Sequence, residues 1–184
     1  AFELGGVRFE LLSTPGGETT DSMVIWLPQH RNCFSGNLFS ALFGHIANLV
    51  TIRGDRYRDA LRFIESLDRV LALEPDLLLV GHHDPVTGRD LIRSELLRLR
   101  AAVLYVHDET VRGMNEGKDV WTLMREIELP PELEVGQGYG KVSWAVRTFW
   151  EEYVGWFKLQ STTELYPDPA PAALAELVDA VGVD

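Results

Sequence analysis

The feature that most constrains the fold is a short apolar run, Leu77–Val80, which ends at Gly81 and is followed by two histidines. A continuous apolar run of this length is typical of a strand that is covered on both faces. The preceding segment, 58–73, predicts an amphipathic helix, because four apolar residues fall on one stripe: Ala60, Ile64, Leu67 and Leu71. A helix that leads into a buried strand indicates a layered α/β protein.

Three further apolar runs precede this helix and alternate with turn residues: Val7–Leu12, Met23–Leu27 and Cys33–Gly36. They predict consecutive strands. After the buried strand the chain is predicted to be mostly helical, beginning with a long helix over 90–107 whose narrow apolar seam suits packing against another helix. Gly113 and Gly117 are expected to end it. Shorter helices are expected at 119–124, 143–157 and 172–181, which gives two parts, 1–112 and 113–184.

Composition excludes some classes of function. The chain has 28 acidic and 17 basic residues and a formal net charge of −11, which argues against nucleic-acid binding. Its one cysteine, Cys33, excludes an internal disulfide and a cysteine-rich zinc site. No run reaches the roughly 18 apolar residues of a membrane span, and no signal peptide is visible, so a cytoplasmic protein is expected. The absence of an initial Met suggests a fragment.

Three strand ends carry residues that could bind a metal. Glu18 lies in a glycine-containing turn after the first strand, Asn37 ends the third, and His82 follows the buried strand. In a layered α/β protein such loops gather in one cleft. Carboxylate and imidazole are metal ligands, whereas a neutral amide is a weak one. Asp84 could orient one of the two adjacent histidines.

Each of these residues also has an ordinary explanation when it is taken alone. Glu18 can belong to a solvated, capped turn, Asn37 can be a turn former after glycine, and His82 can be a loop histidine. The order of the three segments favours the metal site.

Taken in this order, Thr14–Thr19, Ser35–Asn37 and Gly81–His83 resemble the later ligand motifs of the metallo-β-lactamase fold. The resemblance implies an α/β (α+β sandwich) protein: half of an αββα fold followed by a mostly helical extension. The fold's early motif, His-x-His-x-Asp-His, occurs nowhere in the chain. An upstream segment or a separate chain is therefore expected to supply the missing histidine ligands.

Glu18 stands where most members of that fold have histidine, which resembles the alkyl sulfatase branch. The segment Asn48–Gly54 is similar to that family's Asn-Leu-x-Thr-Leu-Arg-Gly motif. The resemblance implies that Asn48 and Arg53 hold a sulfate group, and a guanidinium suits an oxyanion. Three later segments resemble the start of the family's dimerisation region and imply a homodimer: 138–147, 153–157 and 163–167.

The resemblance implies a hydrolase of small anionic esters, most directly sulfate esters, that holds two zinc ions in the complete protein through Glu18, His82 and Asn37 among others. No residue of this chain is assigned a catalytic role. Two departures bear on activity. Asn37 replaces a bridging carboxylate, and Trp144 stands where alkyl sulfatases tend to have a histidine that serves as proton donor. Zinc binding by the chain alone is expected to be weak or absent.

Alternatives remain at this point. The same fold could hydrolyse lactones, thioesters or other esters. The chain could instead be a non-catalytic binding or dimerisation module, which Asn37 and Trp144 favour. An acidic protein without any site fits the charge but leaves the three strand-end motifs unexplained.

Overall fold

The core of the protein is a six-stranded sheet whose strands follow one another in chain order. The structure is a computed structural model that describes residues 1–17, 19–40, 42–50, 58–158, 162–167 and 170–182. The strands are β1 (Phe2–Leu4), β2 (Val7–Ser13), β3 (Met23–Leu27), β4 (Asn32–Gly36), β5 (Leu77–Val80) and β6 (Val86–Thr87). The strands predicted from the sequence are all present, and β1 and β6 are additional.

The direction of the strands brings several strand ends to one edge of the sheet. Strands β1 to β4 form an antiparallel meander, and β5 pairs parallel to β4 after a crossover through helix α1 (Ala60–Leu73). Consequently β2, β4 and β5 run in the same direction. Their carboxyl ends, which carry the predicted site segments, lie at the same edge of the sheet.

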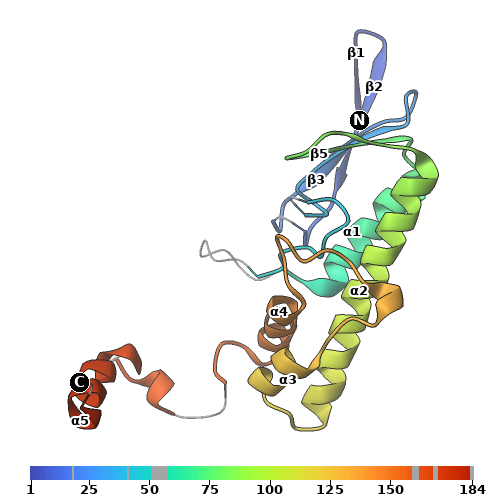
Figure 1. The fold of residues 1–184 in the computed structure, drawn as a ribbon. Coiled ribbons are helices and arrows are strands. Elements are labelled where there is room, and N and C mark those ends of the chain that lie inside the picture. Colours follow the sequence, from blue (N-terminus) through green and yellow to red (C-terminus); the bar gives the residue numbers. More distant parts are fainter. Residues whose placement is uncertain (18, 41, 51–57, 159–161, 168–169, 183–184) are drawn as a thin grey trace.

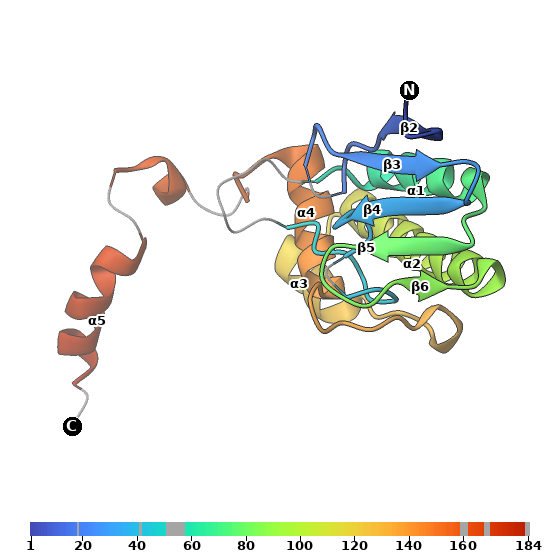
Figure 2. The same ribbon diagram turned by 90° about the horizontal axis from the view of Figure 1, so that it is seen from above.

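Helices α1 and α2 (Arg89–Asn115) cover one face of the sheet (Figure 2). This inner face is apolar in alternate positions, as the period of a strand requires. Its fully or nearly buried residues are Val24, Trp26, Cys33 and Leu78, and the helices contribute Phe63, Leu67, Ile92, Leu96 and Leu99. Burial of these side chains supplies the main stabilisation of the α/β part, since each contributes about 1.5–3 kcal/mol.

The outer face of the sheet carries a row of apolar side chains that no helix among the described residues covers. The register aligns Leu11 with Ile25, Ile25 with Phe34, and Phe34 with Leu79. Leu11 is 45% exposed and Phe34 is 39% exposed. Within the described residues β5 is covered on one face, since only Leu78 of that strand is fully buried, whereas the sequence predicted cover on both faces.

Helix α2 is longer than the sequence predicted. It passes through Gly113 and ends at Asn115, because the missing side chain of Gly113 leaves room for Leu123, whose Cδ2 would overlap a Cβ placed there. Leu123 belongs to α3 (Val120–Glu126), which begins where the Asp119 carboxylate accepts the backbone N–H groups of its first turn. Gly113 thus serves helix packing and not helix termination.

The remaining helical part consists of α4 (Val142–Val154), α5 (Leu174–Val181) and three short 3-10 helices, Pro131–Leu133, Thr162–Leu165 and Ala170–Ala173. Helix α4 packs on α2 and α3. It ends before the predicted Phe157, because Gly155 adopts a positive φ of 79°. Helix α5 stands away from the body of the protein (Figure 1). Among the described residues, no helix combines the length and the apolar character that crossing a bilayer requires.

Candidate metal and anion site at the carboxyl edge of the sheet

Two of the predicted ligands lie side by side at the edge of the sheet. The N–H of Gly81 donates to the carbonyl oxygen of Gly36 at 3.0 Å, which extends the parallel pairing of β4 and β5 by one step. A Cβ at Gly81 would overlap Oδ1 of Asn37. The amide of Asn37 is therefore packed against the residue that immediately precedes His82.

The loop that follows β2 reaches the same place. Gly17 packs so closely on Leu38 that a Cβ would lie 2.9 Å from the Leu38 carbonyl oxygen. Helix α1 braces this loop, because Ser66 Oγ donates to the Pro15 carbonyl oxygen at 2.7 Å. Glu18 itself lies outside the described residues, but its neighbour Gly17 is in contact with the residue after Asn37.

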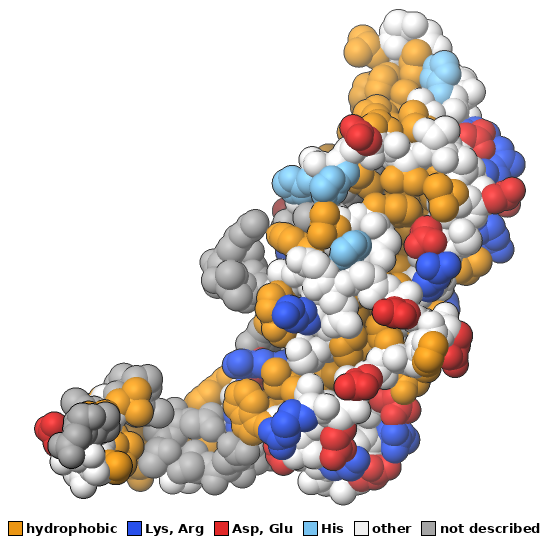
Figure 3. All heavy atoms as spheres, viewed as in Figure 1, with side chains coloured by type: hydrophobic (Ala, Val, Ile, Leu, Met, Phe, Trp, Pro, Cys, Tyr) orange, Lys and Arg blue, Asp and Glu red, His pale blue; other side chains and the backbone are white. Residues whose placement is uncertain are grey.

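The histidine pair is exposed at the end of β5. Within the described part of the chain, neither His82 nor His83 forms a side-chain hydrogen bond, and Asp84 does not orient either ring. Histidine side chains are exposed on the face of the molecule seen in Figure 3, in the part that holds the sheet. An imidazole without a protein partner is free to accept a ligand bond.

The donors present fit a metal site only in part. Among the described residues, no group of three or more His, Cys, Asp or Glu side chains is arranged to hold a metal ion. Cys33 does not contribute, because it is fully buried on the inner face and burial raises the pKa of its thiol to about 12. Of the three predicted ligands, the described residues include only His82 and Asn37, which are too few to hold a metal ion by themselves.

Asn48 lies on the segment that follows β4. Its Oδ1 is buried and has no hydrogen-bond partner among the described residues, whereas its backbone carbonyl accepts from the Arg58 guanidinium. The backbone N–H of Arg58 also donates to the Leu49 carbonyl oxygen at 3.2 Å. Arg53, the second predicted anion ligand, lies outside the described residues. A buried amide oxygen without a partner costs free energy, and a bound ligand or an ordered water would satisfy it.

Sequence reasoning missed His45, which lies three residues before Asn48 on the same segment. Its Nδ1 accepts the Gly138 N–H at 2.9 Å, and its ring occupies the space that side chains at Gly136 and Gly138 would need. The signal that could have revealed it is the alternation of glycines at 136, 138 and 140. Trp144, in the first turn of α4, is 39% exposed and lies under the ammonium group of Lys141.

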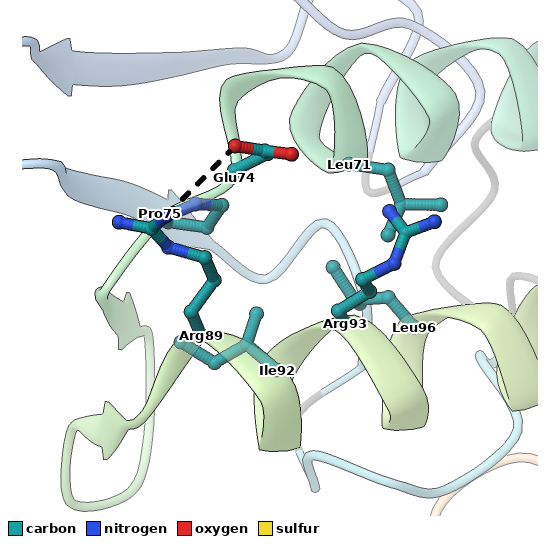
Figure 4. Close-up of a pocket in the computed structure, with 7 residues that line it drawn as sticks. All are labelled: Leu71, Glu74, Pro75, Arg89, Ile92, Arg93 and Leu96. Atoms are coloured by element: carbon teal, nitrogen blue, oxygen red, sulfur yellow. Dashed lines mark ion pairs between the residues drawn. The ribbon is translucent and has the colours of Figure 1, made fainter.

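A pocket between α1 and α2 lies at the other edge of the sheet (Figure 4). It is lined by Leu71, Glu74, Pro75, Arg89, Ile92, Arg93 and Leu96. Two of its polar side chains are already paired, since the Arg89 guanidinium donates to Asp76 at 2.8 Å and lies 4.0 Å from the Glu74 carboxylate. The pocket flanks the start of β5, opposite the end that carries His82, so it is not part of the candidate site.

Comparison with known proteins agrees with the resemblance seen in the motifs. No family model matches the chain. The chain is 31% identical over 184 residues to a linear primary-alkylsulfatase of Pseudomonas sp. (strain ATCC 19151), and the match covers 97% of this chain and 34% of that protein. The stereoselective inverting sec-alkylsulfatase Pisa1 from Pseudomonas sp. superposes with a TM-score of 0.85 and 26% identity over all of this chain and 30% of its own.

A third protein shares the fold alone. A metallo-β-lactamase family protein from Thermus thermophilus is 17% identical, with a TM-score of 0.50 over 84% of this chain and 47% of its own. The mixed α/β architecture with the metallo-β-lactamase fold is thereby confirmed. The chain spans between 23% and 34% of the length of the curated relatives that it matches.

Proposed function

We propose that this chain, a homologue of about one third of an alkylsulfatase with the metallo-β-lactamase fold, supplies half of the site of a sulfate-ester hydrolase. The observation that carries the proposal is the convergence at one sheet edge: Gly17 packs on Leu38, and Asn37 packs on Gly81 beside His82. The strand order brings these ends together, and the support for a site comes from the residues that they carry, an amide at Asn37 and an imidazole at His82.

The proposed metal ligands are His82, Asn37 and Glu18, and the remainder come from a segment or chain that carries histidine ligands. When zinc is bound, it supplies a hydroxide nucleophile near neutral pH. Gly81 keeps the Asn37 amide against the backbone that leads to His82, so the main-chain positions of the two residues are fixed relative to each other before binding. Such preorganisation reduces the entropic cost of forming the site.

The proposed substrate is a small sulfate ester whose anionic group is held by Asn48 and Arg53. Asn48 suits this role because its main chain is anchored by Arg58, which leaves its side-chain amide available. Trp144 is not a proton donor to the leaving group, since an indole N–H does not ionise in the accessible pH range. A proton for the leaving alcohol would have to come from another residue or from water.

Two surfaces of this chain are available for contacts in the complete protein. The outer row of Leu11, Ile25, Phe34 and Leu79 is the apolar face on which a second sheet would pack, and we propose that the part with the missing ligands covers it. The second place is the extension beyond residue 112, which shares α2 with the first part. It exposes Trp156 by 59% and Leu177 by 55%, and we propose that it forms a homodimer contact.

The test compares the chain alone with the complete protein, in which the histidine ligand motif is restored by fusion or coexpression. The chain alone is expected to bind zinc more weakly than micromolar and to hydrolyse neither dodecyl sulfate nor nitrocefin. The complete protein should bind two zinc ions and hydrolyse dodecyl sulfate. Micromolar zinc binding by the chain alone, or no gain on restoration, would contradict the shared site.

Arg53→Ala separates sulfate esters from other substrates. In the complete protein this change should lower kcat/KM for dodecyl sulfate by about 10- to 100-fold, because a charge-assisted contact contributes about 1.5–3 kcal/mol. Turnover of acyl lactones or thioesters, if present, should not change. Arg62→Ala is the control, since Arg62 lies on the exposed side of α1. Equal losses on all substrates would favour a general ester hydrolase.

One observation favours a second function, that of a non-catalytic module: the described residues offer a neutral amide where a carboxylate is expected, and no group of three ligands. Metal analysis of the purified complete protein distinguishes the two. Stoichiometric zinc supports the hydrolase, whereas its absence together with retained dimerisation supports the module.

A further inference from the structure

A glycine-rich strap from the helical part lies along the segment that carries Asn48. The strap is defined here as residues 136–140, and it pairs with residues 44–46. The Ile46 N–H donates to the Gly136 carbonyl oxygen at 2.8 Å, and the Gly136 N–H donates to the Gly44 carbonyl oxygen at 3.2 Å. His45 and Gly136 therefore form a parallel bridge between two segments that are far apart in the chain.

The ring of His45 is inserted into this strap. A Cβ at Gly136 would lie 2.5 Å from the ring, and a Cβ at Gly138 would lie 3.1 Å from it. The Gly138 N–H donates to Nδ1 at 2.9 Å, so Nδ1 is the acceptor and a neutral ring carries its proton on Nε2. Gly136 and Gly138 thus leave space for the His45 ring, and the Gly138 N–H selects the tautomer that is protonated on Nε2.

The contacts continue to the residue next to Asn48. A Cβ at Gly140 would lie 2.6 Å from the carbonyl oxygens of Ile46 and Ala47, so the strap touches the chain directly before Asn48. On the other side, Arg58 binds the carbonyl oxygens of Asn48 and Leu49. The main chain of Asn48 is therefore held from both directions, while its side-chain oxygen is buried without a partner in the described part of the chain.

We propose that His45 is a positioning residue for Asn48: seated in the glycine strap, it fixes the segment that binds the sulfate group and makes substrate affinity depend on the helical part. The inference rests on the proposed function. Its physical basis is that a hydrogen-bonding side chain contributes fully to binding only when its main chain is already in place, because ordering it during binding costs affinity.

Two substitutions at His45 separate the acceptor from the ring. His45→Asn places an amide oxygen close to the position of Nδ1, so it keeps the acceptor for Gly138, whereas His45→Gln moves the acceptor away. In the complete protein, His45→Gln should raise KM for dodecyl sulfate about tenfold and change kcat little, since binding is weakened equally before and in the transition state. His45→Asn should restore most of the affinity.

Gly136→Ala provides a second route to the same effect, because the added methyl group would displace the ring while leaving His45 in the sequence. It should also raise KM. The control is His30→Gln, which changes an exposed histidine in the turn between β3 and β4 and should leave KM unchanged. Combined with Asn48→Ala, His45→Gln should add little, since both remove the same interaction.

The outcomes are distinguishable. If the unmodified complete protein does not turn over sulfate esters, the proposed function fails and this inference with it. If the protein is active but His45→Gln retains the normal KM, or if its effect adds fully to that of Asn48→Ala, the inference alone is overturned. A fall in thermal stability with KM unchanged would assign His45 a purely structural role and would equally overturn it.

Discussion

The side-chain oxygen of Asn37 lies against the Cα of Gly81, where any larger residue would overlap it. This contact joins the ends of the parallel strands β4 and β5, and it brings Asn37 next to His82. A glycine at position 81 therefore leaves room for this position of the Asn37 side chain, in addition to any role in the turn that follows the strand.

Gly81→Ala should displace Asn37 and destabilise the edge of the sheet. Inserting one methyl group into a packed region costs about 1–3 kcal/mol, and the low end is expected here because the overlapping oxygen ends a flexible side chain. The loss should appear as a lower midpoint of urea unfolding and, in the complete protein, as weaker zinc binding. Gly117→Ala is the control: its positive φ of 79° makes alanine unfavourable, but its surroundings are open and distant from the site. Zinc binding that survives Gly81→Ala unchanged would remove Asn37 from the ligand set.

Asn37→Asp should strengthen metal binding in the complete protein. The substitution keeps the shape of the side chain and adds a negative charge beside His82, and ligand charge is a main determinant of affinity for divalent cations. The zinc dissociation constant, measured by competition with a chromogenic chelator, should fall about tenfold or more. Asn32→Asp, at the start of β4, supplies the same charge at the opposite end of the strand and should have no effect. An unchanged dissociation constant in Asn37→Asp would show that this side chain does not approach the metal.

Glu152→Gln should stabilise the protein at neutral pH and have no effect in acid. Partial burial, and then the nearby Asp59 carboxylate, raise the pKa of Glu152. A carboxyl with a raised folded-state pKa favours folding when it is protonated, and this contribution is lost as the pH rises through the folded-state pKa. Removing the charge should therefore help only at higher pH, by at most about 1 kcal/mol because solvent screens the site.

The measurement for Glu152→Gln is the urea midpoint at neutral pH and again below the normal pKa of a carboxyl. Glu65→Gln is the control, since Glu65 is exposed on α1. A variant that is stabilised equally at both pH values would point to a packing effect and contradict the electrostatic explanation.

Gly113→Ala should destabilise the protein, although replacing glycine by alanine within a helix normally stabilises it by about 1 kcal/mol. The reversal is expected because the new Cβ would overlap the Leu123 side chain where α3 packs on α2. Shortening the partner in a Gly113→Ala/Leu123→Val double variant should recover part of the loss. If Gly113→Ala alone raises the thermal midpoint, the close packing of these helices is not required.

Much of the fold was predictable because its signals are local. The strand runs Val7–Leu12 and Met23–Leu27 and the helix over 58–73 follow from periodicity and from turn residues, and they occur where expected. The two missed strands, β1 and β6, are too short to show any period. The end of α2 was mispredicted because Gly113 is placed there for its contact with Leu123 of α3. A contact between two helices leaves no pattern in the local sequence.

The candidate site was partly predictable for a related reason. Asn37 and His82 each follow a strand, and the topology places both strand ends at one edge, so their proximity follows from the strand order. His45 does not directly follow a strand, and its contacts are with glycines far along the chain. Its hydrogen-bond donor Gly138 is 93 residues away in the sequence. Only the folded chain brings these residues together.

The uncovered row from Leu11 to Leu79 also has a consequence for how such a protein is made. The inner face already has its own core under α1 and α2, whereas this row stays in contact with water unless a second layer covers it. Under the proposed function, association with that layer would add to the stability of the sheet. Produced on its own, the chain exposes a flat apolar surface that favours self-association through this face. Its solubility in a cell would then depend on how quickly a second layer covers that surface.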